Sequence, residues 1–358
     1  DKIVAKVKTE INNNVNAKVD FTDFDLSMIK NFPDFTLSLV NFSVVGINEF
    51  NGDTLAGIKN FNATIDLMSV IKGDQIKIES ISLDEPNINL LVLKNGKANW
   101  DIAKPSKPSA TTGETSSFKA TLEKYEIIKG NILYDDASMD FKMIMTDLNH
   151  TGNGDFTQDL FILNTTTSIA ATNLWFGGVK YLHKVVTDLK ADLEMDMKNM
   201  KFTFKENELV LNGLNLGFNG WVSMPADDID MDLTFNAKQS EFKSFISLVP
   251  GIYTEEFKDL KSSGTLAFKG FVKGKYNDKS MPGFGLTLNV NKGMFKYPSL
   301  PTAVNNVNID LAIANPDGVP DHTSIDLNKM HLEMDAEPFD ARLKIRTPVS
   351  DADMDGMI

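Results

Sequence analysis

Apolar and polar side chains alternate over long stretches of this chain, and this two-residue period constrains its fold more than any other feature. The clearest example runs from Leu189 to Lys198, where Leu193 and Met195 share one parity and Glu194 and its charged neighbours take the other. A period of two places successive side chains on opposite faces of a β-strand, so it predicts strands that are buried on one face only. The period begins near Phe35, and the usual strand length of about 5–6 residues then predicts on the order of twenty strands.

The stretch from Ile76 to Trp100 indicates where such a strand bends. Ile76 and Ile78 share one parity, whereas Ile81 and Leu83 share the other. One extra residue within Glu79–Ser80 accounts for this change, and an inserted residue of this kind predicts a β-bulge.

Prolines and Asn-Gly pairs indicate where the strands are interrupted or end. Pro86 has no N–H to donate, so we expect it to interrupt the ladder of hydrogen bonds. Asn-Gly tolerates positive φ at both positions, so this pair predicts tight turns at Asn95–Gly96, Asn212–Gly213 and Asn219–Gly220.

Three segments depart from the period of two and favour helices. Asp1–Ala17 carries an apolar residue at every fourth position, which predicts an N-terminal helix. A short helical turn is expected over Leu26–Asn31, before Pro33. A helical insertion is expected around 240–260, where Ser240 can cap a helix that carries Phe242, Phe245 and Ile246.

The domain organisation follows from these changes of pattern. Residues 1–105 form a first region, with a helix and the first strands, and residues 118–358 continue the strands. Residues 104–117 are rich in Pro, Ser and Thr and lack any apolar side chain larger than alanine, so they predict a linker or exposed loop at 106–117.

Composition excludes several classes of protein. The 358 residues carry a net charge of −13, which disfavours binding to nucleic acid. The chain has no cysteine, so neither disulfides nor thiolate metal sites are possible. No apolar run approaches the roughly 20 residues that span a bilayer as a helix.

No pattern of residues predicts catalysis or a metal centre. The four histidines, His150, His183, His322 and His331, show no ligand spacing, and there is no Gly-x-Ser-x-Gly motif. The acidic residues fall mostly on the polar side of predicted strands. We therefore expect no catalytic residue, no metal and no cofactor, and a protein that is not an enzyme.

Asp351–Ile358 contains the pattern Asp-x-Asp-x-Asp-Gly, which matches the first part of a calcium-binding loop. Such a loop in an EF-hand lies between two helices, whereas the alternation of Ala341, Leu343 and Ile345 before it predicts a strand. We favour a turn that leads into another strand.

Several segments resemble a known family. They are the Asn31-Phe32-Pro33 step, the run from Ile65 to Gly73, the unit from Ile76 to Trp100 with its Lys-Asn-Gly turn and Asn-Trp pair, and, later, Ser247–Pro250, Gly293–Pro298 and Pro338–Leu343. In these residues the chain is similar to AsmA-family envelope proteins, as found in Bacteroidetes-type bacteria.

The resemblance implies a fold and a place in the cell. The fold would be mainly β, with a long curved antiparallel sheet that forms a taco-like hydrophobic groove, an N-terminal helix and one or two short helices. Related chorein-type proteins are bridge-like lipid-transfer proteins. The resemblance implies a location in the periplasm of a Gram-negative bacterium, anchored to the inner membrane by a helix that precedes Asp1.

The alternation by itself leaves two architectures open. An open trough would expose an apolar lining, whereas a closed sandwich would fill it with a second sheet. The first supports lipid transfer between the inner and outer membranes, with phospholipids or other acyl lipids as partners. The second would be a non-enzymatic scaffold for outer-membrane protein assembly. An outer-membrane protein is a possible partner in either case.

The lining of the predicted groove is assigned to apolar positions whose neighbours along the strand are polar. The methionines among them are either ordinary core or a compliant wall for acyl chains, since the thioether side chain is flexible. The predicted lipid-binding residues are Ile78, Ile81, Leu83, Phe141, Met143, Met145, Leu193, Met195 and Met197.

Tight calcium binding is not expected at the Asp351–Asp355 cluster, because it lacks the flanking helices of an EF-hand. We expect the melting temperature to be unchanged by calcium, since only a ligand that binds the folded state shifts it. A calcium-dependent rise that disappears in Asp353→Ala would show that the loop is a calcium site.

Overall fold

The computed structural model describes residues 8–9, 11–28, 34–72, 77–104, 121–225, 228–246, 248, 260–277, 279–298 and 301–358. These residues are mainly β, as predicted, with eighteen strands and only short helices. The chain divides into two compact units, Asp1–Val186 and Thr187–Ile358, hereafter unit 1 and unit 2. The division falls within strand β9 (Val179–Asp196), whereas the sequence predicted boundaries near residues 105 and 117. The predicted linker, 106–117, lies outside the described residues.

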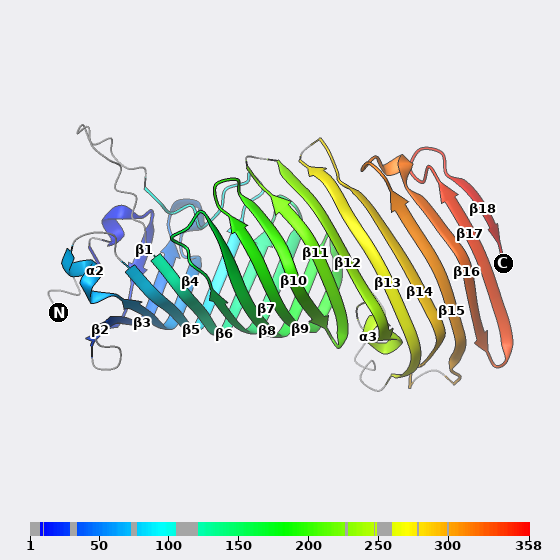
Figure 1. Ribbon diagram of the computed structural model, residues 1–358, viewed down its shortest axis with the longest axis horizontal. Coiled ribbons are helices and arrows are strands. Elements are labelled where there is room, and N and C mark those ends of the chain that lie inside the picture. Colours follow the sequence, from blue (N-terminus) through cyan, green and yellow to red (C-terminus); the bar gives the residue numbers. More distant parts are fainter. Residues whose placement is uncertain are drawn as a thin grey trace. The chain divides into compact units, whose positions relative to one another are not determined.

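Unit 1 is one layer of strands (Figure 1). The strands are β1 (Ala17–Asp20), β2 (Asp23–Ser27), β3 (Phe35–Gly46), β4 (Thr54–Ile65), β5 (Lys77–Val92), β6 (Thr121–Asp136), β7 (Phe141–Asn153), β8 (Leu160–Phe176) and the first part of β9 (Val179–Asp196). β1 and β2 both pair with β3, and the ladder then follows chain order from β3 to β8.

One pairing in unit 1 differs from the expected antiparallel sheet. β5 and β6 run parallel, so the chain must return between them to the end at which β5 began. The described start of this return, through Lys104, is held by a buried amide. Asn99 donates to the carbonyl of Asn89 (2.7 Å) and accepts from the N–H of Leu91 (3.0 Å).

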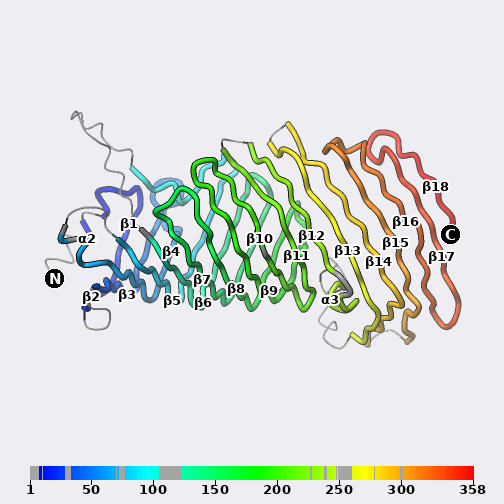
Figure 2. The backbone as a smooth tube through the Cα atoms, in the orientation of Figure 1, coloured from blue at the N-terminus to red at the C-terminus, as the bar shows by residue number. Residues whose placement is uncertain are grey.

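Unit 2 is a second single layer, and all its register-assigned pairings are antiparallel. It contains the rest of β9, then β10 (Lys201–Leu211), β11 (Leu214–Ser223), β12 (Ile229–Glu241), β13 (Lys261–Tyr276), β14 (Gly283–Lys296), β15 (Val304–Asn315), β16 (Ser324–Met334), β17 (Glu337–Arg346) and β18 (Asp353–Met357). The backbone trace shows each of these strands beside the next one in the chain (Figure 2).

The helices correct several expectations. The predicted N-terminal helix does not extend to Ala17, because β1 begins there, although residues 11–14 are helical. The helical turn predicted at Leu26–Asn31 is wrong at its start, since Leu26 belongs to β2. Residues 1–7, 10 and 29–33 lie outside the described residues. The prediction around 240 is confirmed by α3 (Phe242–Ile246), whereas residues 249–259 of the insertion are not described.

A helix that the sequence did not predict follows β4. In α2 (Leu67–Lys72), the carboxylate of Asp66 accepts the N–H of Ser69 (2.7 Å), which caps the first turn. The other helical elements are the 3-10 turns η1 (Asn48–Phe50) and η3 (Pro320–His322). No helix in the described part of the chain has the length and apolar character needed to cross a bilayer.

Several long strands of unit 1 have an irregular residue along their length. The predicted bulge at Glu79 is confirmed, because Ile78 pairs with Ile65 and Ser80 pairs with Thr64, which leaves Glu79 as an extra residue. A second change lies where Glu85, just before Pro86, takes a positive φ of 47°. The register aligns Asn41 of β3 and Lys129 of β6 with Glu85, and Asp147 of β7 lies close by; each of these three has a φ of 51–52°. These changes form a line across the sheet, and bulges of this kind bend strands.

Asparagine side chains replace some of the ladder hydrogen bonds at these irregular positions. In unit 1, the N–H of Lys129 donates to Oδ1 of Asn149 (3.0 Å). In unit 2, the N–H groups of Asp192 and Lys292 donate to Asn207 and Asn308, each at 3.1 Å. At these positions the backbone N–H therefore keeps an acceptor.

The Asn-Gly predictions have different outcomes. Asn212–Gly213 is a tight turn between β10 and β11, with both φ values positive, as predicted. Asn95–Gly96 also lies in a turn, just after β5. Asn219–Gly220 is not a turn, because both residues lie within β11. A Cβ on Gly220 would approach the carbonyl oxygen of Asp232 at 1.9 Å, so glycine here permits close contact with β12.

The C-terminal acidic cluster follows a turn and leads into a strand, as predicted. The hydroxyl of Thr347 donates to the carbonyl of Asp351 (2.5 Å), and β18 begins at Asp353. Register pairs Asp353 and Asp355 with Arg346 and Lys344 of β17. These two carboxylates are therefore placed opposite cations in the sheet.

Asn207 offers a test of the irregular positions, because it bridges two neighbouring strands. Its amide accepts from Asp192 and donates to the carbonyl of Phe218 (3.3 Å). Asn207→Ala should lower the free energy of unfolding by about 1–3 kcal/mol, measured by urea denaturation, since a half-buried N–H loses its partner. The control is Asn215→Ala, an exposed residue of β11, whose effect should stay within about 0.5 kcal/mol. Equal effects would contradict this role for Asn207.

Candidate functional site

The strand register gives unit 1 one apolar face. Residues that are paired across neighbouring strands project to the same side of a sheet. One such row crosses five strands, and it consists of Leu39, Phe61, Leu83, Ile127 and His150. The predicted residues Ile81 and Ile78 extend this face toward the start of β5, where they pair with Ala63 and Ile65.

The predicted residues of β7 lie on the same face. Met145 pairs with Ile132 and Met143 pairs with Tyr134, both on β6. Ile132 pairs in turn with Ile88, which lies on the same side of β5 as Leu83 because the parity changes between them. Phe141 closes the strand opposite Asp136. The six predicted residues of unit 1 thus share one half-buried face.

Unit 2 has an apolar face of its own. Its longest row crosses eight strands, β11 to β18, and consists of Phe218, Phe235, Gly270, Leu286, Ile313, Ile325, Ile345 and Met354. Leu193 and Met195 lie on the same face, paired with Phe204 and Phe202 of β10. Met197 does not belong to this strand, because β9 ends at Asp196 and Met197 lies in the following turn, 42% exposed.

The opposite faces are polar. In unit 1 the hydroxyl of Ser38 donates to Asn62 (2.7 Å), and Asn60 donates to Asp84 (2.8 Å), across neighbouring strands. In unit 2 Lys273 forms an ion pair with Asp232 (2.8 Å). Each sheet therefore separates an apolar side from a polar side.

The apolar faces are covered only in part by described elements. In unit 2, α3 packs against β12, β13 and β14 and inserts Phe242 and Ile246 into the core (Figure 1). In unit 1, Ile11, Val15 and Ile102 pack on a small core around Val44. All eighteen described strands belong to one hydrogen-bonded sheet, so no separate second sheet is present in the described residues.

One titratable cluster lies within the apolar face of unit 1. The ring nitrogens of His150 lie 2.8 Å from the hydroxyl of Thr167 and 3.2 Å from that of Tyr125. Burial lowers the pKa of His150 and raises the pKa of Tyr125, because it disfavours the charged form of each. Both side chains are therefore neutral near pH 7 and add no charge to this part of the face.

The described residues include one acidic group with metal-ligand spacing. Oxygens of Asp34, Asp66 and Glu79 lie within 4.8 Å of one another, all half-buried. Burial, followed by the proximity of Asp34, raises the pKa of Glu79. Asp66 also caps α2 through Ser69, which gives this carboxylate a structural role.

Sequence reasoning missed part of each apolar face. Tyr125 and Ile127 of β6 belong to a clear alternation of apolar and polar residues. Leu286 and Ile313 belong to similar alternations on their own strands, so all four positions could have been predicted in the same way. Gly270 was not, because it lies in the row without a side chain and is covered by the ring of Phe235. A Cβ on Gly270 would lie 2.4 Å from Cζ of Phe235.

The fold and these faces define a class of protein: single-layered β-sheets, each with one open apolar side. Residues 1–151 match the model of the AsmA family, so this part of the chain belongs to the AsmA family. Comparison with curated proteins and with solved structures finds no match.

His150 predicts a pH dependence with a definite sign. Its pKa in the folded state is lowered below the ordinary 6.5, so its neutral form stabilises the fold above about pH 6.5 and that stability is lost as the pH falls toward the lowered pKa. Unfolding free energies measured from about pH 7.5 to 5 should decline less steeply for His150→Gln than for the wild type.

His331 contributes a pH dependence of stability with the opposite sign, and it is present in both the wild type and His150→Gln. The carboxylate of Asp340 (2.9 Å) raises the pKa of His331, so its contribution is complete below about pH 6.5 and is lost as the pH rises through the raised pKa. The difference between wild type and His150→Gln isolates His150. Parallel pH profiles would show that this imidazole is hydrated in the folded protein.

Proposed function

We propose that the chain is a non-enzymatic lipid-transfer protein of the cell envelope, which carries the acyl chains of phospholipids along the apolar faces of its sheets. One observation carries this proposal: each unit has a continuous apolar face, and the described strands form no separate second sheet to pack against it. Large exposed apolar surfaces in a folded protein mark binding sites for apolar partners.

The energetics of acyl transfer agree with such a face. Each CH₂ removed from water contributes about 0.8 kcal/mol, so an extended chain gains many small increments along a row of side chains. The headgroup would stay in water, since burying a charged group without a partner is costly. Methionines such as Met143 and Met195 adapt to varied chains because their side chains are flexible. No bond is made or broken in this process.

The family match supports the cellular setting of the proposal. We place the protein in the periplasm, attached to the inner membrane, where it transfers lipid toward the outer membrane and contributes to envelope homeostasis. An outer-membrane protein is the partner we expect at the far end. The alternative, a scaffold for outer-membrane protein assembly, would favour a sandwich of two sheets, whereas the described strands all belong to one sheet.

A charge placed on the apolar face tests the proposal. Met195 lies half-buried on this face in unit 2. Met195→Glu should leave the melting temperature nearly unchanged, because an open face lets water reach the carboxylate. It should strongly reduce lipid that co-purifies with the protein, measured by native mass spectrometry, since an acyl chain cannot hydrate that charge. The matched control is Met281→Glu, which changes a 58% exposed side chain outside the strands.

Two outcomes would contradict the proposal. If Met195→Glu unfolds the protein, Met195 is packed in a closed core. If the variant folds and retains as much lipid as Met281→Glu, acyl chains do not pass over this part of the face.

A further inference from the structure

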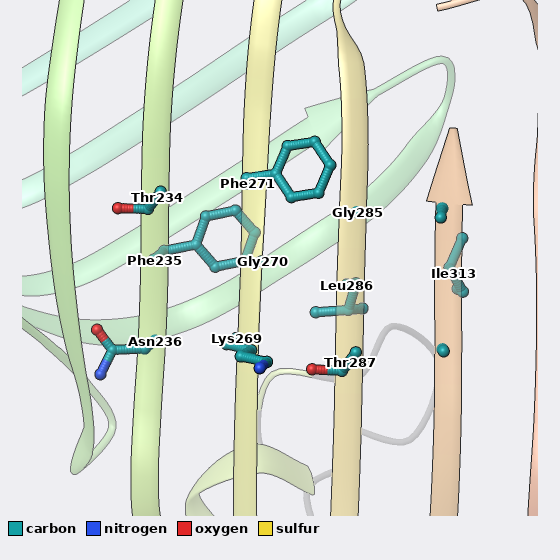
Figure 3. A pocket seen from close by; sticks show the side chains of 12 residues that line it. Thr234, Phe235, Asn236, Lys269, Gly270, Phe271, Gly285, Leu286, Thr287 and Ile313 are labelled. Atoms are coloured by element: carbon teal, nitrogen blue, oxygen red, sulfur yellow. The ribbon is translucent and has the colours of Figure 1, made fainter. Parts of the chain in front are cut away.

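Unit 2 contains a hollow of about 410 Å³ where four of its strands lie side by side (Figure 3). It is lined by three consecutive residues from each of four neighbouring strands: 234–236, 269–271, 285–287 and 312–314. In each triplet the middle residue belongs to the apolar row, so the two outer residues project to the opposite side of the sheet. Eight of the twelve lining residues therefore belong to the polar face, and the hollow opens there.

Small residues form the floor of this hollow. Gly285, Ala312 and Ala314 lie on β14 and β15, where longer side chains would fill the space. The ring of Phe271 lies over Gly285, because a Cβ there would lie 2.5 Å from Cε1 of Phe271. Phe271 is nevertheless 40% exposed. The result is an apolar depression with an aromatic wall on a face that is otherwise polar.

The lysine side chain of Lys269 lies at the edge of the depression. Lys269 pairs in register with Asn236 and Thr287, and none of the ion pairs in the described part of the chain includes it. The next lysines along β13 differ, since Lys273 binds Asp232 and Lys275 binds Asp228. The ammonium of Lys269 is thus available to an anion.

The acidic side chain nearest to Lys269 in its row already has a cationic partner. In the same row as Lys269, Ala312 pairs with Asp326 of β16, and Asp326 forms an ion pair with Arg346 (2.7 Å). The acid closest in this row therefore has a cation of its own. A ligand that fits the depression would combine an apolar tail with one negative charge.

We propose that this hollow binds an anionic amphiphile of the fatty-acid class, with its carboxylate at Lys269 and its chain against Phe271 and the floor. Its volume falls within the range of about 300–1,000 Å³ that is usual for small-ligand sites. The site is independent of the proposed transfer of phospholipids, because the two lie on opposite faces of the sheet.

The test measures binding of decanoate to the purified chain by calorimetry, below the concentration at which decanoate forms micelles. Lys269→Met should weaken binding by about fivefold, as expected for a solvent-accessible ion pair. Lys273→Met, which removes a lysine paired with Asp232, should leave it unchanged. Decanol, which lacks the charge, should bind wild type and Lys269→Met equally.

A second variant fills the hollow. Ala314 is exposed, so Ala314→Leu should fold normally, with an unchanged melting temperature, and should lose decanoate binding. Met195→Glu, on the opposite face, should retain it. The proposal is overturned if decanoate binds Ala314→Leu and Lys269→Met as tightly as wild type, or if Met195→Glu abolishes binding, which would place the ligand on the apolar face instead.

Discussion

The structure depends on keeping apolar side chains on one side of long strands that also bend. A strand with an uninterrupted two-residue period has a fixed apolar side, but one inserted residue would move every later side chain to the other side. In this chain the sequence changes parity at the same place as the backbone, as in the step from Leu83 to Pro86 across Glu85. The change of parity in the sequence therefore offsets the inserted residue in the backbone, and apolar side chains stay on one face along the strand.

This compensation has a cost in backbone hydrogen bonds that polar side chains offset. A bulge leaves an N–H without its ladder partner, and a buried N–H without any partner is strongly unfavourable. Asn149, Asn207 and Asn308 supply the missing acceptors from the neighbouring strand. The positive φ values of Lys129 and Lys292 are tolerated in this setting, although neither residue favours that region.

Much of this fold could be predicted from the sequence, because period and parity are local properties. The strands, the bulge at Glu79, the turn at Asn212–Gly213 and α3 all follow from short stretches of residues. The parallel pairing of β5 with β6 could not be predicted, since it depends on where the chain returns after Trp100. Asn219–Gly220 misled the turn prediction because the close approach of β12 also requires glycine.

The candidate sites differ in predictability for a related physical reason. An apolar face is recognisable in a sequence by large side chains at alternate positions. The register places Ile81, Met145 and Leu193 on the apolar faces, whereas β9 ends before Met197. That these residues bind lipid stays a prediction. The hollow on the polar face exists because Gly285, Ala312 and Ala314 have no long side chains to fill it. Small residues of this kind show no distinctive pattern along a strand. Only the register shows that they are neighbours across β14 and β15, beside Phe271 and beside Lys269, which forms no ion pair with the described residues. A single-layered sheet can therefore carry independent sites on its two faces. Large apolar side chains form one of them, and small residues that leave space form the other.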